Sequence, residues 1–248
     1  MSEMRVIARH AGTILAGQMA VMAFGVTDTL VAGRFSSEAL AALSVGAAVY
    51  ISIFVALMGV LQAQLPVWAE LRGAGRDAEV GKSVRQALYL CLLTMVAGIA
   101  LLLSPGPLLR LTEVPPALQG EVEHYLAILA AALPPALLFR MYGTLNQSLG
   151  RPQLVTWLQL GSLCIKVPLS VLLTFGGLGL DPMGASGCAW ATLIVNYGMT
   201  GLAVWLLKTD DLYRPYQLWK KPERPDWRRI AEFARLGVPN GLAIMVEV

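Results

Sequence analysis

Charged residues are scarce in this 248-residue chain. They make up 14% of the sequence, whereas soluble domains carry about 25%, and hydrophobic residues reach 56% with a mean hydropathy of +0.61. This shortage of charge argues against an ordinary soluble domain and predicts an integral membrane protein. The chain is therefore best divided into membrane-spanning helices rather than into soluble domains.

Cysteine and histidine are also rare. The three cysteines, Cys91, Cys164 and Cys188, fall inside apolar segments, and an odd number without CxxC spacing indicates neither a disulfide framework nor a metal site. We interpret them as small packing residues. The two histidines, His10 and His124, lie near opposite membrane faces in the predicted topology, so they do not form a joint site.

The sequence has no GxxxxGK[ST] phosphate loop, no GxSxG nucleophile elbow and no HExxH zinc motif. Without nucleotide-binding or hydrolytic motifs, the chain is predicted not to be an enzyme and to need no cofactor. Its net charge of +3 does not indicate nucleic-acid binding. If the protein does work, an ion gradient must supply it.

Long apolar runs predict six membrane-spanning helices, since about 20 apolar residues cross the hydrocarbon layer. The predicted spans are residues 11–33, 43–66, 84–104, 121–148, 153–175 and 185–208. A seventh apolar run covers residues 236–248, and at 1.5 Å per residue it reaches only about 20 Å. We expect the chain to stop inside this seventh helix.

Basic residues are distributed unevenly over the predicted loops. With the N-terminus in the cytoplasm, fifteen lie on the inner side and only Arg34 and Arg110 on the outer side, as the positive-inside rule requires. The inner set is Arg5, Arg9, Arg72, Arg76, Lys82, Arg85, Arg151, Lys208, Arg214, Lys220, Lys221, Arg224, Arg228, Arg229 and Arg235. We therefore expect a cytoplasmic N-terminus.

Three regions follow from this pattern: a six-helix transmembrane lobe at 1–208, a cytoplasmic linker with an amphipathic helix at 209–235, and the start of the seventh helix at 236–248. Aromatic residues alternate with Lys and Arg in the linker, among them Trp219 and Trp227. This pattern suits the lipid headgroup layer, and a solvated loop is the alternative interpretation.

Asp28 lies within the first span, about five residues before its outer end. A carboxylate costs up to about 3 kcal/mol to insert at the centre of a membrane helix, so something must compensate its charge. A proton or a bound cation would remove the charge, which predicts a coupling site. The alternative is a structural residue that pairs with a neighbour or reaches outward.

Lys166 lies near the middle of the fifth span, just before Pro168. Counting along the helices places Asp28 about 6 Å further out, within reach of a lysine side chain. We hypothesise an ion pair that a proton or substrate can break; a purely structural lysine is the alternative.

Glu247 lies about 16 Å into the seventh span, where a carboxylate is also costly, and it is a further candidate for cation binding. Polar residues inside the spans, Thr192 and Asn196 among them, indicate either a polar cavity or interhelical hydrogen bonds.

Several stretches resemble, in order, the multidrug and toxic compound extrusion (MATE) family, particularly its NorM-like branch. They are GQMAVMAFGVTDTLVAGRFSSEALAALSVG, which begins in the first span, LPVWAELRGAGR after the second, LNQSLGRPQLV at the end of the fourth, MGASGCAWAT at the start of the sixth and LGVPNGLAIMVEV at the start of the seventh. Together they extend over the whole chain, so the resemblance identifies it as the N-terminal half of such a protein.

The resemblance implies an all-α fold of twelve helices in two lobes, of which this polytopic chain supplies one six-helix lobe and the start of the seventh helix. It implies cation or proton coupling at Asp28 and sodium coordination near Glu247. The candidates for lining the cavity are Gln18, Ser170, Thr192 and Asn196. Many members carry asparagines on the fifth helix where this chain has Lys166 and Ser170. A fixed positive charge there would repel sodium.

The implied activity is secondary active export of cationic amphipathic drugs against inward flow of H+ or Na+, in the bacterial inner membrane. The partners would be the lipid bilayer, small-molecule drugs or organic cations, and a C-terminal lobe. Two alternatives remain open: a lipid-linked or polysaccharide flippase of a related fold, and a membrane fragment that does not transport.

Overall fold

The secondary structure is helical. The computed structural model describes residues 3–106, 115–177, 179–220 and 223–247, and among them the side chains of 11–106, 115–177, 179–220, 223–239 and 241. Within these ranges there is no strand, only an isolated bridge between Gly177 and Leu180. The predicted all-α class is confirmed.

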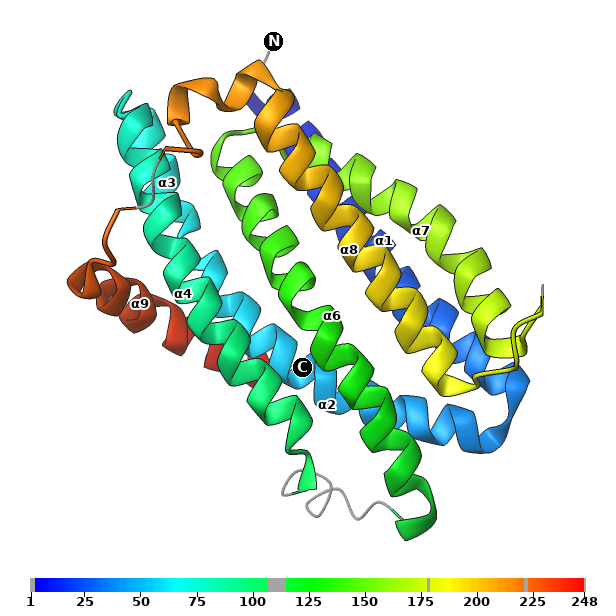
Figure 1. Ribbon diagram of the computed structural model, residues 1–248. Coiled ribbons are helices and arrows are strands. Elements are labelled where there is room, and N and C mark those ends of the chain that lie inside the picture. Colours follow the sequence, from blue (N-terminus) through cyan, green and yellow to red (C-terminus); the bar gives the residue numbers. More distant parts are fainter. Residues whose placement is uncertain (1–2, 107–114, 178, 221–222, 248) are drawn as a thin grey trace. The chain divides into compact units, whose positions relative to one another are not determined.

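The helices are ordered along the chain from α1 to α9 (Figure 1). In chain order they are α1 (Glu3–Phe35), α2 (Ser37–Gln62), α3 (Leu65–Gly73), α4 (Asp77–Leu103), α6 (Pro116–Ser148), α7 (Pro152–Phe175), α8 (Ala185–Thr209), the 3-10 helix η1 (Asp211–Tyr216) and α9 (Trp227–Glu247). A short break at residues 63 and 64 separates α2 from α3.

Six helical stretches among the described residues are long and apolar enough to cross a membrane. They are Ala11–Phe35, Ser37–Gly73, Asp77–Leu103, Pro116–Ser148, Pro152–Phe175 and Ala185–Thr209, so the six predicted spans are confirmed. Several helices begin earlier than the apolar runs do. Asp77 and Glu79, for example, form the first turn of α4, where the helix dipole favours acidic side chains.

Polar side chains and prolines define several helix starts. The Ser36 hydroxyl accepts a hydrogen bond from the Ala39 amide at 2.9 Å and caps α2. Pro116 and Pro152 open α6 and α7, positions where the missing amide hydrogen has no cost. The Asp226 carboxylate accepts from the Arg228 amide at 3.1 Å and begins α9.

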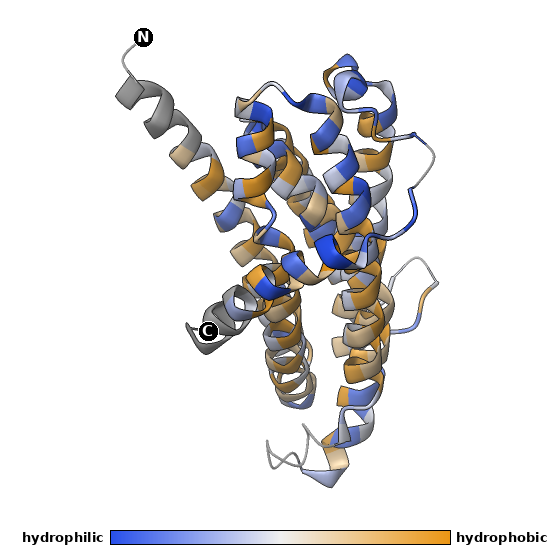
Figure 2. Ribbon diagram, turned by 90° about the vertical axis from the view of Figure 1, so that its left-hand side faces the viewer, coloured by the Kyte–Doolittle hydropathy of each residue, from blue (hydrophilic) through white to orange (hydrophobic). Residues whose placement is uncertain are grey.

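The chain forms two compact units, and four helices contribute residues to both. Unit 1 comprises residues 1–51, 99–132 and 152–197, and unit 2 comprises residues 52–98, 133–151 and 198–248. Figure 2 shows hydrophobic residues along the spans and hydrophilic residues gathered on the segment that joins α8 to α9.

In unit 1, α1 and α7 pack along each other. The buried face of α7 is largely polar and carries Thr156, Gln159, Ser162, Lys166 and Ser170, whereas its exposed face carries apolar side chains. This is the reverse of a soluble amphipathic helix. It is the arrangement expected where lipid surrounds the protein and polar groups must face other helices.

A close approach of α8 to α7 is possible because residue 187 is glycine. A Cβ atom at Gly187 would lie 2.6 Å from the Leu173 carbonyl carbon and 2.6 Å from the Thr174 nitrogen. Both are backbone atoms that cannot move aside independently. The two helix backbones therefore meet directly at this point.

In unit 2, side chains of α4 hold the linker between η1 and α9. Arg85 donates to the Gln217 carbonyl at 2.7 Å and to the Glu223 carboxylate at 3.2 Å. Gln86 donates to the Arg224 carbonyl at 3.1 Å and accepts from the Asp226 amide at 2.8 Å. We call these contacts the linker clasp.

Glu223 is the acidic member of the linker clasp. Burial alone would raise the pKa of the Glu223 carboxyl, but the hydrogen bond from Arg85 and the charge of Lys82 outweigh that effect and lower the pKa below its ordinary value. The carboxylate thus stays ionised and paired at neutral pH.

The helix α9 runs from Trp227 to Glu247 without interruption, so the boundary expected between residues 235 and 236 lies inside one helix. Gly237 and Gly241 are one turn apart and face the backbone of α2. A Cβ at Gly237 would lie 2.6 Å from the Val60 carbonyl oxygen, and one at Gly241 would overlap the Ala56 carbonyl oxygen. This GxxxG spacing lets the two helices approach closely.

We predict that Gly187→Ala destabilises the protein, because its methyl group meets the α7 backbone. Overpacking of this kind costs about 1–3 kcal/mol, which should lower the melting temperature in detergent by several degrees. The matched control is Gly198→Ala in the same helix, where nothing lies within 4 Å of the added Cβ. An equal melting temperature for the two variants would show that α7 and α8 do not meet at Gly187.

We predict that Arg85→Ala together with Gln86→Ala releases the linker, since both variants remove contacts of the linker clasp. Deuterium uptake of peptides from residues 217–226 should rise, while Arg76→Ala, which removes only the ion pair of Arg76 with Glu79 in the first turn of α4, should leave uptake unchanged.

Deuterium uptake by the linker peptides from residues 217–226 should also depend on pH. Because the pKa of Glu223 is lowered in the folded state, its contribution is fully present above the ordinary carboxyl pKa and is lost as pH falls through the lowered value. After correction for intrinsic exchange, the linker amides should lose protection from deuterium exchange through this acid range. Constant protection would contradict the role given to Glu223.

Candidate functional site

A cluster of polar side chains is buried inside unit 1. Its centre is Asp28, which α1 presents with only 8% of the residue exposed. Lys166 on α7 is 2% exposed, and its Nζ lies 2.7 Å from Asp28 Oδ2. The ion pair expected from the sequence is therefore present, and both of its charges lie within membrane-spanning helices.

The Lys166 ammonium is surrounded on three sides. Besides Asp28, it donates to the Thr192 hydroxyl on α8 at 2.7 Å, and it lies 5.0 Å from the centre of the Phe24 ring on α1. The Thr192 hydroxyl in turn donates to the Cys188 carbonyl at 2.9 Å. A carboxylate, a hydroxyl and an aromatic face thus stabilise one buried positive charge.

The second carboxylate oxygen of Asp28 has its own partner. Ser170 on α7 is fully buried and donates to Asp28 Oδ1 at 3.2 Å. Further along, Thr174 Oγ1 lies 3.4 Å from Cys188 Sγ, and that thiol is 3.9 Å from the Asp28 carbonyl. The cluster therefore links α1, α7 and α8, and every charge in it is matched.

Helical spacing brings these residues together. Lys166, Ser170 and Thr174 are spaced four residues apart on α7, as are Cys188 and Thr192 on α8, so each set forms one stripe on its helix. Pro168 lies between Lys166 and Ser170 and removes one backbone hydrogen bond from α7. Gly187 permits the close α7–α8 contact beside the cluster.

The other predicted site residues lie elsewhere. Gln18 is exposed on α1, nearly three helical turns before Asp28. Asn196 is partly buried, and its amide donates to the Ala132 carbonyl of α6 at 3.5 Å. Glu247 ends α9, and its side chain lies outside the described residues, so the proposed sodium coordination there stays a prediction.

Sequence reasoning missed three members of the cluster. Cys188 was interpreted as a packing residue, and Thr174 and Phe24 were not considered. The four-residue spacing of Thr174 from Ser170, and of Cys188 from Thr192, was the available signal. The contact with Phe24 had none, because an aromatic residue in an apolar span is indistinguishable from a packing residue.

The cluster has the donor chemistry of a monovalent cation site, with the position of the cation taken by a side chain. The oxygens of Asp28 and Thr192 both lie 2.7 Å from the Lys166 nitrogen. Among the described residues, no group of three or more His, Cys, Asp or Glu side chains could hold a metal. Two chemical events are open to this cluster. Asp28 can exchange a proton, or Lys166 can be released when another cation competes for the carboxylate.

Comparison with known proteins agrees with the helical architecture. The sequence model of the MatE family matches residues 14–172. The chain is 38% identical over 239 residues to a protein named "Probable multidrug resistance protein NorM" from Aromatoleum aromaticum, covering 96% of this chain and 52% of that protein. It is 34% identical to "Multidrug resistance protein PmpM" from Pseudomonas aeruginosa, covering 99% of this chain and 52% of the relative.

Solved structures show the same fold. The eukaryotic MATE transporter AtDTX14 superposes with a TM-score of 0.87 at 17% identity, covering 99% of this chain and 54% of that one. The MATE transporter NorM-NG, solved in a complex that includes a monobody, gives a TM-score of 0.77 at 26% identity, covering 94% of this chain and 51% of that one. The chain spans about half the length of the relatives it matches, and it is a multi-pass membrane protein that belongs to the MatE family.

Proposed function

We propose that this chain forms one lobe of a secondary multidrug exporter, in which protonation of Asp28 breaks the ion pair with Lys166 and thereby drives a conformational change. The names of the relatives support multidrug efflux. The buried ion pair of unit 1 is the observation that carries the coupling mechanism. A second lobe is needed for transport, because alternating access requires two parts that move against each other.

The energetics of the pair suit a switch. Two opposite charges at 2.7 Å stabilise each other in the low-dielectric interior. When a proton binds Asp28, the carboxyl becomes neutral and Lys166 is left as an uncompensated buried charge, a change that costs about 3–5 kcal/mol in comparable pairs. That free energy favours a rearrangement in which α7 moves Lys166 to water or to a new partner.

A cationic drug can act at the same point. An organic cation that approaches Asp28 competes with Lys166 for the carboxylate and carries the charge that Lys166 otherwise supplies. Proton and drug then bind the same carboxylate in alternation, which is the requirement for antiport of a cationic compound against inward proton flow. The direction of transport follows if the N-terminus lies in the cytoplasm, as the distribution of basic residues indicates.

The proton, rather than Na+, is the coupling ion that we propose for this lobe. A sodium ion needs several oxygen ligands at short range, and the Lys166 ammonium already takes up both Asp28 Oδ2 and Thr192 Oγ1. Binding of Na+ there would place two positive charges side by side at a buried carboxylate. Sodium coordination near Glu247 remains a separate proposal.

We predict that Asp28→Asn abolishes efflux of an organic cation such as ethidium from cells that express the complete reading frame containing this chain. It should also destabilise the protein by about 3–5 kcal/mol, because Lys166 is left unpaired. The double variant Asp28→Asn with Lys166→Met should recover most of the thermal stability but no efflux. The control is Asp181→Asn, an exposed carboxylate outside the cluster.

The double variant separates the two roles of the pair. If the ion pair only holds α1 and α7 together, restoring stability should restore ethidium efflux. Efflux by the stable double variant at the wild-type rate would therefore disprove coupling at Asp28.

We predict that Lys166→Asn changes the ion dependence. Its amide oxygen would replace a positive charge by a neutral ligand beside Asp28, Thr192 and Ser170, and small oxygen-lined sites of this kind suit hard cations. Ethidium efflux by the variant should become stimulated by an imposed sodium gradient, whereas the wild type should respond to the pH gradient alone. Sodium-stimulated efflux by the wild type through an intact Asp28–Lys166 pair would contradict the proposal.

A further inference from the structure

Arg140 places a positive charge within a membrane span of unit 2. It lies on α6, eight residues before the last residue of that helix and about 12 Å inside its end. Arg140 is half-buried and shares one face of α6 with the fully buried Leu133 and Leu137. Within the described part of the chain, its guanidinium has neither an ion pair nor a hydrogen bond. A charge at this depth requires compensation.

Gln64 is a buried amide of the same unit. It lies at the break between α2 and α3, and only 1% of the residue is exposed. Its Oε1 and Nε2 atoms are both buried, and neither has a hydrogen-bond partner among the described residues. Folded proteins rarely leave such a group unsatisfied, and a bound water or ion is the usual explanation.

Two contacts show that the stretch from α2 to α3 runs parallel to α6. A Cβ atom at Gly98 of α4 would lie 2.6 Å from Leu57 and 2.5 Å from Leu133, so these two leucines meet beside α4. Fifteen residues further along each stretch, the Arg72 guanidinium donates to the Ser148 carbonyl at 3.2 Å. The two stretches are therefore in register at both contacts.

Gln64 and Arg140 lie between these two contacts at the same level. Each comes seven residues after the leucine of its own stretch and eight residues before the second contact. Trp68, one turn after Gln64 on the same face, donates its indole N–H to Ser83 of α4 at 3.0 Å, so this face is turned toward α4. The amide and the guanidinium thus occupy one level of the interior that α3, α4 and α6 form.

The described spans of unit 2 hold no acidic residue at the level of Arg140. Their acids are Glu70, Asp77 and Glu79. Glu70 is exposed six residues beyond Gln64, about 9 Å further along the chain. The other two lie in the first turn of α4, beyond the end of α3.

The acids of α9 do not compensate Arg140 either. Glu232 is exposed. The helix runs antiparallel to α2, because its two glycines meet first Val60 and then Ala56. Ala56 is already eight residues from Gln64, and Glu247 lies about 9 Å beyond the second glycine. The end of α9 therefore leads away from the level of Gln64.

We propose that Gln64 and Arg140 bind a small monovalent anion such as chloride in the interior of unit 2. The guanidinium supplies the charge and several N–H donors, and Gln64 Nε2 supplies a further donor. One uncompensated positive charge requires one negative charge. The anion is small because the face of α6 that carries Arg140 is otherwise fully buried. This site needs no part of the coupling mechanism proposed for Asp28.

The experiment measures the line width of the chloride NMR signal with the purified chain in a nonionic detergent, because chloride bound to a protein broadens that signal. Gluconate replaces chloride so that the ionic strength stays constant. We expect saturable broadening that bromide abolishes by competition. Loss of a charged hydrogen bond should weaken binding in Arg140→Gln by about tenfold or more, and loss of a neutral one in Gln64→Leu by about threefold to tenfold.

Melting temperatures provide a second measurement. Chloride should raise the melting temperature of the wild type above its value in gluconate, because the anion binds the folded state. The rise should be smaller in both variants. If Arg140→Gln fails to fold, Gln64→Leu still tests the site, since it exchanges an unpaired amide for an apolar group of similar size.

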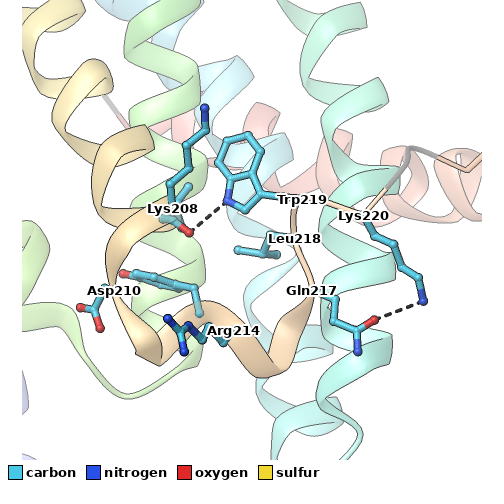
Figure 3. Close-up of a pocket in the computed structure, with 9 residues that line it drawn as sticks. Lys208, Asp210, Arg214, Gln217, Leu218, Trp219 and Lys220 are labelled. Atoms are coloured by element: carbon cyan, nitrogen blue, oxygen red, sulfur yellow. Dashed lines mark hydrogen bonds between the residues drawn. The ribbon is translucent and has the colours of Figure 1, made fainter.

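The matched control is Lys220→Gln, which removes another cation of unit 2. The exposed Lys220 ammonium donates to the Gln217 side chain at 3.2 Å and extends away from Lys208, on the other side of Trp219 (Figure 3). Water already solvates this charge, so the variant should bind chloride as the wild type does. Absence of saturable broadening in the wild type, or equal broadening in the wild type and a folded Gln64→Leu variant, would overturn the proposal.

Discussion

The ion pair between Asp28 and Lys166 is the interaction on which the arrangement of unit 1 depends. Neither charge is tolerable alone inside a membrane span, so α1 and α7 must be held at the separation that places the two groups 2.7 Å apart. Thr192 on α8 shares the ammonium and Ser170 shares the carboxylate. Three helices are thereby fixed at one depth relative to one another.

Because lipid surrounds the helices, polar contacts rather than apolar ones determine how they pack. Between membrane helices the apolar surface offers little preference for one neighbour over another, so close backbone contacts and hydrogen bonds determine the packing. The polar buried face of α7 and the contact of α8 at Gly187 meet both requirements. In unit 2, the linker clasp and the Gly237–Gly241 contact with α2 have the corresponding roles.

Much of this architecture could be predicted from the sequence because it depends on the length of apolar runs and on the rise of a helix per residue. Apolar runs predicted the six spans, and helix rise predicted that Asp28 lies about 6 Å further out than Lys166, within reach of the lysine side chain. The depth of a residue, however, does not give the direction in which its side chain points. Gln18, for example, was expected to line the cavity, and its side chain is exposed on α1. The linker clasp could not be predicted either, because three of its four hydrogen bonds join Arg85 or Gln86 to backbone atoms, whose positions no side-chain pattern encodes.

In the mechanism that we propose, Asp28 exchanges a proton while Lys166 supplies its counter-charge. Infrared difference spectroscopy of the purified protein on acidification tests it most directly, since a protonated carboxyl has its own C=O stretching band. If Asp28 takes up the proton, this band appears in the wild type at the pH values where pH-driven efflux occurs, and it is lost in Asp28→Asn while all other carboxyl signals are retained. A spectrum in which Asp28→Asn and the wild type are identical throughout that pH range would contradict it.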